Sequence, residues 1–90
     1  MKKHTRIYLK HFGFGMDDFI PCELCGSRAV DIHHISPRGM GGSKQKDEIE
    51  NLMALCRVHH DEAEGEILSE KYLRSKHLSY MEANDEDQKR

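Results

Sequence analysis

The feature that most constrains this chain is a metal-ligand spacing that occurs twice. Cys22-Glu-Leu-Cys25 and Cys56-Arg-Val-His59 each place two residues between a pair of candidate ligands. Two intervening residues let a tight turn, or the first turn of a helix, direct both side chains at one ion. Three thiolates and one imidazole make the closed tetrahedral set that structural zinc prefers. Since this set uses every cysteine of the chain, we expect Zn²⁺ at these four residues.

The length of the chain makes such a cross-link plausible. Its 90 residues allow one domain, and a domain of this size buries a modest core that often needs a metal or a covalent link. Two other readings of the cysteines stay open, unligated thiols and a redox C-x2-C pair. A redox pair normally lies in a larger thioredoxin-like pattern, which the sequence does not show. A reducing compartment disfavours disulfides, so metal ligation is the better interpretation of the three cysteines.

The charge of the chain is small overall but uneven. The net charge is -2, and zinc bound by three thiolates would change it by -1. Basic residues gather in the first ten positions and between Arg38 and Lys46, a distribution that allows a basic patch for nucleic acid. The sequence has no apolar run near the roughly 20 residues of a membrane span and no signal-peptide apolar stretch. We therefore expect an intracellular protein with no membrane partner.

The pattern of apolar residues predicts one α+β domain over residues 1–90. "HTRIYLKHFG" favours a short N-terminal helix that stops at Gly13. "RAVDIHHI" and "NLMALC" favour two strands around a loop rich in Gly, Pro and Lys. A helix starts near Arg57, and Gly65 weakens it. These elements make a core of about 20–66, followed by a helix of about 67–83 and a frayed tail, 84–90. The apolar stripe of that last helix comprises Leu68, Tyr72, Leu73, His77, Tyr80 and Met81.

Three imidazoles remain once His59 is assigned to zinc. His59 and His60 point about 100° apart on a helix, so they can serve two different sites. A strand-loop-strand-helix arrangement would bring His60 together with His33, His34 and Asn51. Neighbouring residues of a regular strand point to opposite faces. His33 and His34 therefore reach one site only if the strand bends or ends there, which the following Ser-Pro favours.

Four motifs in this order, "CELCG", "DIHHI", "ENLMALC" and "CRVHH", resemble the HNH endonucleases, most of all the small phage-type members with a zinc-bound core. The resemblance covers roughly Cys22 to Asp61. It implies a ββα-metal (His-Me finger) core with a structural zinc, flanked by the N-terminal and C-terminal helices. It also implies a DNA endonuclease that hydrolyses phosphodiester bonds with one divalent metal, encoded by a phage or prophage, leaving 5′-phosphate and 3′-hydroxyl ends.

The resemblance assigns a role to each remaining site residue. His34 matches the general base that deprotonates the attacking water, and Asn51 matches the residue that holds the hairpin loop and positions that base. His33 and His60 match the ligands of the catalytic metal. Many relatives have Asp at the position of His33. The nitrogen-rich site makes Mn²⁺, Ni²⁺ or Zn²⁺ plausible beside Mg²⁺.

Phosphodiester hydrolysis requires the same groups, a general base and a bound cation. A histidine near neutral pKa suits the activation of water, and a single cation suits the neutralisation of the phosphate and of the leaving oxygen. Arg38 could add a bidentate phosphate contact, and Lys44 and Lys46 could steer the DNA backbone. The glycines of the same loop would let it approach DNA. These basic residues can equally be solvated loop charges.

Other interpretations stay open beside this one. The chain could be a zinc-bound nucleic-acid-binding module with an inactive site, or a protein-interaction adaptor that uses its C-terminal helix. His60 could replace His59 at zinc, and Asn51 could be a simple turn residue. Glu64, one helical turn after His60, could approach the catalytic metal or be an exposed acid. A monomer would cut one strand, so double-strand cleavage would need a homodimer or two visits.

Overall fold

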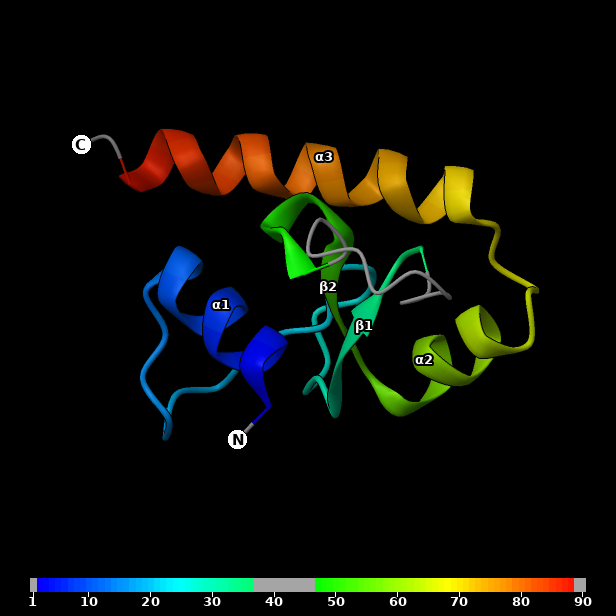
Figure 1. Ribbon diagram of the computed structural model, residues 1–90, viewed down its shortest axis with the longest axis horizontal. Helices are drawn as coiled ribbons and strands as arrows, with labels where there is room; N and C mark the ends of the chain where they lie inside the picture. The colour runs from blue at the N-terminus through cyan, green and yellow to red at the C-terminus, as the bar shows by residue number, and fades with distance from the viewer. Residues whose placement is uncertain (1, 37–46, 89–90) are drawn as a thin grey trace.

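A two-stranded antiparallel hairpin followed by a helix forms the centre of the fold (Figure 1). The computed structural model describes residues 2–36 and 47–88, with side chains described as far as residue 84. The chain is α+β. Its elements follow the order expected of a ββα-metal core that is preceded by one helix and followed by another. The elements are α1 (Lys3–Phe12), β1 (Asp31–His34), the 3-10 turn η2 (Ile49–Asn51), β2 (Leu52–Leu55), α2 (Arg57–Glu64) and α3 (Glu70–Gln88).

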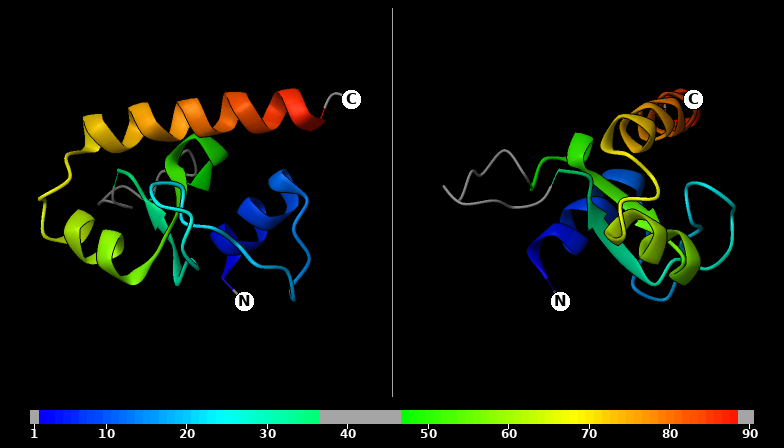
Figure 2. Two further views of the ribbon diagram at one scale, coloured as in Figure 1. Left: turned by 180° about the vertical axis from the view of Figure 1, so that it is seen from behind. Right: turned by 90° about the vertical axis from the view of Figure 1, so that its right-hand side faces the viewer.

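The hairpin has helices on both of its faces (Figure 2). Ile32 of β1 packs with Leu52 and Ala54 of β2 against Tyr8 of α1. The other face carries a second core cluster, which includes residues of α2 and α3. Because both faces are covered, every residue of β2 is buried, as its continuous apolar sequence requires. The second cluster comprises Cys22, Ile35, Met53, Leu55, Cys56, Ala63 and Leu73.

The N-terminal helix ends where the sequence predicts. Gly13 has a φ of 75°, in the left-handed region that glycine adopts without steric cost, and its N–H bonds back to the carbonyls of Leu9 and Lys10. The predicted start of α2 at Arg57 is also confirmed, and the helix ends before Gly65. Among the described residues, no helix combines the length and the apolarity needed to cross a membrane.

The C-terminal helix differs from the prediction at both ends. It begins at Glu70, not near residue 67, because Ser69 Oγ accepts a hydrogen bond of 3.1 Å from the Tyr72 N–H and caps the first turn. It continues to Gln88, beyond the predicted end near residue 83, over a stretch that contains no Gly or Pro to stop a helix. The frayed tail over residues 84–90 stays a prediction. The apolar stripe is also narrower than predicted, since the Tyr72 side chain is exposed.

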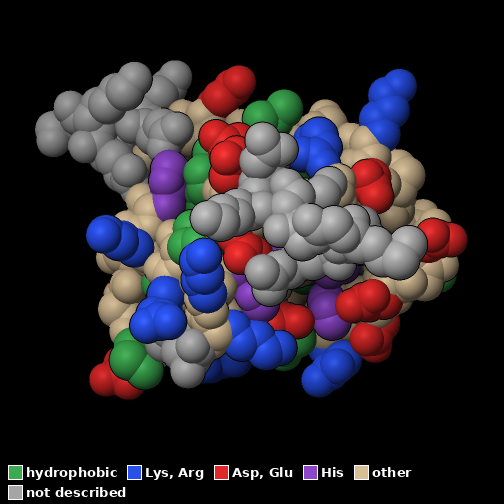
Figure 3. Space-filling model, viewed as in Figure 1, with side chains coloured by type: hydrophobic (Ala, Val, Ile, Leu, Met, Phe, Trp, Pro, Cys, Tyr) green, Lys and Arg blue, Asp and Glu red, His purple; other side chains and the backbone are tan. Residues whose placement is uncertain are grey.

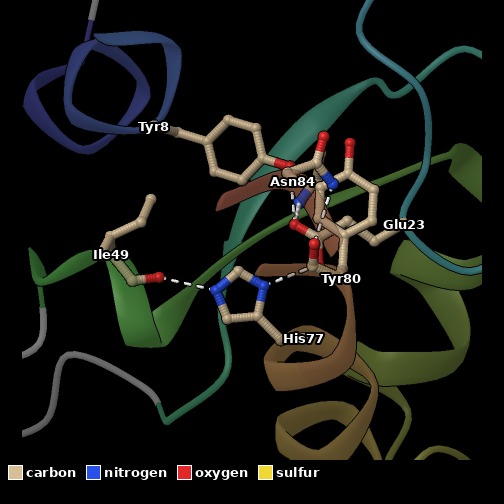
Figure 4. A network of polar contacts seen from close by, with 7 residues as sticks. Tyr8, Glu23, Ile49, His77, Tyr80 and Asn84 are labelled. Carbon is tan, nitrogen blue, oxygen red and sulfur yellow. Dashed lines mark hydrogen bonds and ion pairs between the residues drawn. The ribbon is translucent and has the colours of Figure 1, made fainter. Parts of the chain in front are cut away.

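A buried polar network joins the helices to the hairpin (Figure 4). Glu23, which lies between the first two cysteines, accepts a hydrogen bond of 2.6 Å from the Tyr8 hydroxyl of α1. Its other carboxylate oxygen lies 2.6 Å from His77 Nδ1 of α3, and His77 Nε2 donates to the Ile49 carbonyl. Burial and the neighbouring Glu23 carboxylate raise the pKa of Tyr8 far above its usual value. The network thus fixes α1 and α3 to the same point of the core.

Candidate metal centres

The four residues with the repeated spacing meet in one place. Cys56 Sγ lies 3.3 Å from His59 Nδ1, Cys22 Sγ lies 3.5 Å from the same nitrogen, and the Sγ atoms of Cys25 and Cys56 are 3.7 Å apart. The first pair sits on a turn closed by a hydrogen bond from the Gly26 N–H to the Cys22 carbonyl. Gly26 has a φ of 81°, which favours glycine. The second pair spans the first turn of α2.

These separations fit a tetrahedral zinc ion. With Zn–S bonds of about 2.3 Å and Zn–N bonds of about 2.0–2.1 Å, tetrahedral S–S edges are about 3.8 Å and S–N edges about 3.5 Å. Hydrogen bonds from the side chain and backbone of Ser27 lower the pKa of Cys25 to about 6, which favours the thiolate that binds metal. Burial raises the pKa of Cys22. The Cys3His cluster is therefore compatible with structural zinc.

A second group of candidate ligands joins β1 to α2. His33, His60 and Glu64 have ligand atoms close enough together to hold one ion. The rings of His33 and His60 meet edge to face with centroids 5.3 Å apart, and His60 Nε2 lies 3.3 Å from Glu64 Oε1. Asp31 Oδ2 lies 3.5 Å from the same nitrogen. Burial, followed by the proximity of His60, lowers the pKa of His33, which leaves the imidazole neutral and able to bind a cation.

A third group surrounds His34. His34 Nε2 lies 2.9 Å from Asp47 Oδ1, and its ring lies against that of His4 with centroids 4.4 Å apart. Ligand atoms of His4, His34 and Asp47 also lie close enough together for one ion. Burial, followed by the proximity of His34, lowers the pKa of His4.

Both histidine groups line one open pocket of about 240 Å³. His33 and His34 point to opposite faces of β1, as a regular strand requires, but the strand ends at His34 and both side chains reach the pocket. On the face shown in Figure 3, histidine side chains lie beside acidic ones, with lysine and arginine side chains nearby. The residues that line the pocket are Lys2, His4, Asp31, Ile32, His33, His34, His60 and Glu64.

Asn51 holds the chain that follows β1 in place. Its Oδ1 accepts a 2.7 Å hydrogen bond from the Ser36 N–H, and its Nδ2 donates a 3.0 Å bond to the Ser36 carbonyl. Arg74 of α3 donates to Ser36 Oγ at 2.7 Å and approaches Asn51 Oδ1 at 3.4 Å. The side chain of Asn51 therefore fixes the backbone two residues after His34.

The structure separates the two histidines of α2 as the 3.6-residue turn predicts. His59 faces the thiols, whereas His60 faces His33, so His60 does not replace His59. Glu64 lies with His60 although most of its side chain is exposed. Arg38, Lys44 and Lys46, which the sequence predicts to contact DNA, lie outside the described residues.

Sequence reasoning missed His4, Asp47 and Arg74. His4 lies on a helix far from the motifs, and Asp47 lies in the acidic run after the loop. Asp47 could have been predicted from its position four residues before Asn51. Both residues contact the end of β1, Asp47 through His34 and Asn51 through Ser36. The sequence contains no comparable signal for His4 or Arg74.

Comparison with known proteins finds a family match over just under half of the chain. The family model described as "HNH endonuclease" matches residues 22–65. The chain carries an HNH domain over these residues. The matched segment of the HNH domain contains both candidate zinc pairs, His33, His34, Asn51 and His60. The family is one of nucleases. Helix α1 with His4, and helix α3 with Arg74 and His77, lie outside the matched segment.

One curated protein resembles part of the chain. The "Uncharacterized protein YdfU" of Escherichia coli (strain K12) is 43% identical over 42 residues, which cover 47% of this chain and 12% of that protein. The aligned part is thus a small fraction of the relative's length. No solved structure matches the chain.

Proposed function

We propose that this chain is a DNA endonuclease that hydrolyses phosphodiester bonds with one divalent cation and His34 as general base. The observation that carries the proposal is the convergence of His33, His34 and His60 on one open pocket within an HNH domain. The chain would form a single nuclease domain over residues 1–90. The helices outside the matched segment pack on the same core through the Tyr8–Glu23–His77 network.

The hydrogen bond between His34 and Asp47 supports the role of His34. A carboxylate accepts hydrogen bonds, so the hydrogen of the neutral ring belongs on Nε2, which faces Asp47 Oδ1 at 2.9 Å. The lone pair then lies on Nδ1, which would take the proton from the attacking water. An ordinary imidazole has a pKa suited to this transfer near neutral pH. Asp47 would hold the ring in this tautomer, much as an aspartate orients the histidine of a hydrolase triad.

The arrangement of His33 and His60 supports their role as ligands of the catalytic cation. Their rings meet edge to face and both line the pocket, and Glu64 and Asp31 add carboxylate oxygens beside His60. Such a cation would neutralise the phosphate charge and stabilise the departing oxygen. Two imidazoles and a carboxylate suit Mn²⁺, Ni²⁺ or Zn²⁺ as well as Mg²⁺.

Asn51 would act as a positioning residue. It fixes the backbone of Ser36 through two hydrogen bonds, and this backbone follows directly from the strand that carries His34. The Cys3His cluster would hold the hairpin to α2 with a structural Zn²⁺, so that the ligands of β1 and of α2 keep their spacing. Arg38, Lys44 and Lys46 would contact DNA phosphates. An intracellular location and a phage or prophage origin stay predictions from the sequence.

The experiment that tests the proposal is a plasmid nicking assay across metals. Zinc-loaded protein is incubated with supercoiled plasmid and with Mg²⁺, Mn²⁺, Ni²⁺ or Zn²⁺ in turn. We expect conversion to the nicked form with at least one of these cations, and none with EDTA. If no cation supports nicking while the protein retards DNA on a gel at low salt, the chain is a nucleic-acid-binding module instead. If the protein neither cuts nor binds DNA, an adaptor role for α3 is favoured.

A further inference from the structure

The group formed by His4, His34 and Asp47 has no place in a one-cation mechanism beyond the orientation of His34. We propose that these three residues form a second cation site, selective for borderline ions such as Ni²⁺, Co²⁺ or Zn²⁺, and that its occupation switches the nuclease off. The inhibitory part rests on the proposed function, because it requires His34 to be the base. The binding part does not.

The geometry of the group fits such an ion. Two ligands bound at about 2.0–2.1 Å to one ion are about 2.9–3.4 Å apart when they occupy neighbouring coordination positions. His34 Nε2 and Asp47 Oδ1 are 2.9 Å apart. His4 brings a third ligand atom within 4.8 Å of the other two. Two imidazoles with one carboxylate are the donor set that borderline divalent cations prefer, whereas Mg²⁺ prefers oxygen.

The three ligands come from separate elements that are already held in place. His4 lies on α1, His34 ends β1, and Asp47 precedes η2. The residues His4 and Asp47 are 9% and 5% exposed, so little side-chain freedom is lost when they bind. The pocket beside them gives a cation access. Asp31 and Glu64 line this pocket and favour a cation, while the Lys2 ammonium, which also lines it, opposes one.

The inhibition follows from the tautomers of imidazole. In the uninhibited state, the ring hydrogen of His34 sits on Nε2 and the lone pair of Nδ1 is available. A cation that binds between His34 and Asp47 takes the lone pair of Nε2, so a neutral ring must carry its hydrogen on Nδ1. His34 can then no longer accept a proton from water at Nδ1. The total number of protons on the ring is unchanged; only their position moves.

His4 is the ligand that distinguishes this site from the rest of the HNH segment. It lies outside the segment that matches the HNH family, so the same segment on another scaffold would lack the third ligand. His4→Gln removes that ligand and leaves His34, Asp47 and the His33–His60 pair in place. His11→Gln is the matched control, since His11 lies on the same helix but does not line the pocket.

The test counts bound cations and follows cleavage in the same samples. Protein loaded with zinc at the Cys3His cluster is dialysed against Ni²⁺, and nickel per chain is measured by elemental analysis. We expect His4→Gln to bind one nickel fewer than wild type and His11→Gln to bind the same number. If His4→Gln fails to fold, Asp47→Asn is a second variant that should bind one nickel fewer than wild type. Equal nickel counts in wild type, His4→Gln and Asp47→Asn would overturn the site, whether or not the protein cuts DNA.

The cleavage arm tests the inhibition separately. With increasing Ni²⁺, the wild-type nicking rate should rise as the His33–His60 site fills and then fall by about a hundredfold, the low end of what a general base contributes. His4→Gln should keep the rise and lose the fall. A fall that persists in a His4→Gln protein with one nickel fewer would overturn the inhibitory role. If no metal supports cleavage, the proposed function fails, and the nickel counts still decide whether the site exists.

Discussion

His77 Nδ1 and Glu23 Oε1 lie 2.6 Å apart, and neither side chain is exposed to solvent. His77 Nε2 must carry a hydrogen, because its partner is the Ile49 carbonyl, which only accepts. One further proton therefore lies between Nδ1 and the carboxylate. Since Glu23 lies between the candidate zinc ligands Cys22 and Cys25, this contact joins α3 directly to the turn that carries them.

Loss of one member of this pair should destabilise the fold strongly. His77→Leu leaves the Glu23 carboxyl buried without its partner, a change that typically costs about 3–5 kcal/mol. The free energy of unfolding, measured by denaturant titration, should fall by that amount. Glu82→Gln is the control, because Glu82 is an exposed residue on the same helix and its replacement should change stability by less than about 0.5 kcal/mol. A His77→Leu protein as stable as this control would refute the structural role of the pair.

The raised pKa of Tyr8 makes stability depend on alkaline pH. Burial and the Glu23 charge keep the Tyr8 hydroxyl protonated in the folded state, while an unfolded tyrosine ionises near its usual value of about 10. Above that pH the unfolded chain binds fewer protons than the folded chain, so stability falls as pH rises, by up to about 1.4 kcal/mol per pH unit. Tyr8→Phe should lack this part of the decline between pH 10 and 11. Parallel stability curves for the two proteins over this range would contradict the assignment.

Removal of zinc should unfold the domain. Structural Zn²⁺ contributes about 10–16 kcal/mol in zinc-finger peptides at neutral pH, more than a domain of this size gains from its core. Cys56→Ser should therefore lose bound zinc and its cooperative thermal transition, measured by elemental analysis and circular dichroism. A chelator should have the same effect on wild type, with recovery on addition of Zn²⁺ but not of Mg²⁺. Retention of one zinc per chain and of the wild-type melting temperature in Cys56→Ser would exclude this cluster as the structural site.

The parts of this structure that could be predicted depend on local spacing. The two cysteine-containing pairs and the succession of His59 and His60 follow from turn and helix geometry within a few residues. The alternation of His33 and His34 follows from the two-residue period of a strand. These local rules predicted the two pairs that meet in the Cys3His cluster. The meeting of His33 with His60 was expected from the strand-loop-strand-helix order of the elements.

The contacts that could not be predicted join distant elements through tertiary packing. His4 reaches His34 only because α1 docks on the hairpin through Tyr8, and no periodicity marks that docking. His77 lies on the predicted apolar stripe, but its partner Glu23 is 54 positions away. Each of these contacts depends on the folded core and not on the residues beside it.

The histidine at position 33 should determine the preference for metals. His33→Asp replaces an imidazole with a carboxylate, and oxygen ligands favour Mg²⁺ over Ni²⁺. The ratio of the nicking rate with Mg²⁺ to that with Ni²⁺ should rise by about tenfold, equivalent to about 1.4 kcal/mol of relative affinity. Val58→Ala, an exposed position on α2, should leave the ratio unchanged. An unchanged ratio in His33→Asp would mean that this side chain does not bind the catalytic cation.

The most direct test of the proposed nuclease is the cleavage rate of His34→Ala on supercoiled plasmid, with zinc content and circular dichroism recorded on the same sample. We predict a rate about 10²–10⁴ lower than wild type with the best cation, the usual contribution of a general base, while zinc content and helicity match wild type. A folded, zinc-loaded His34→Ala protein that nicks plasmid at the wild-type rate would contradict the account.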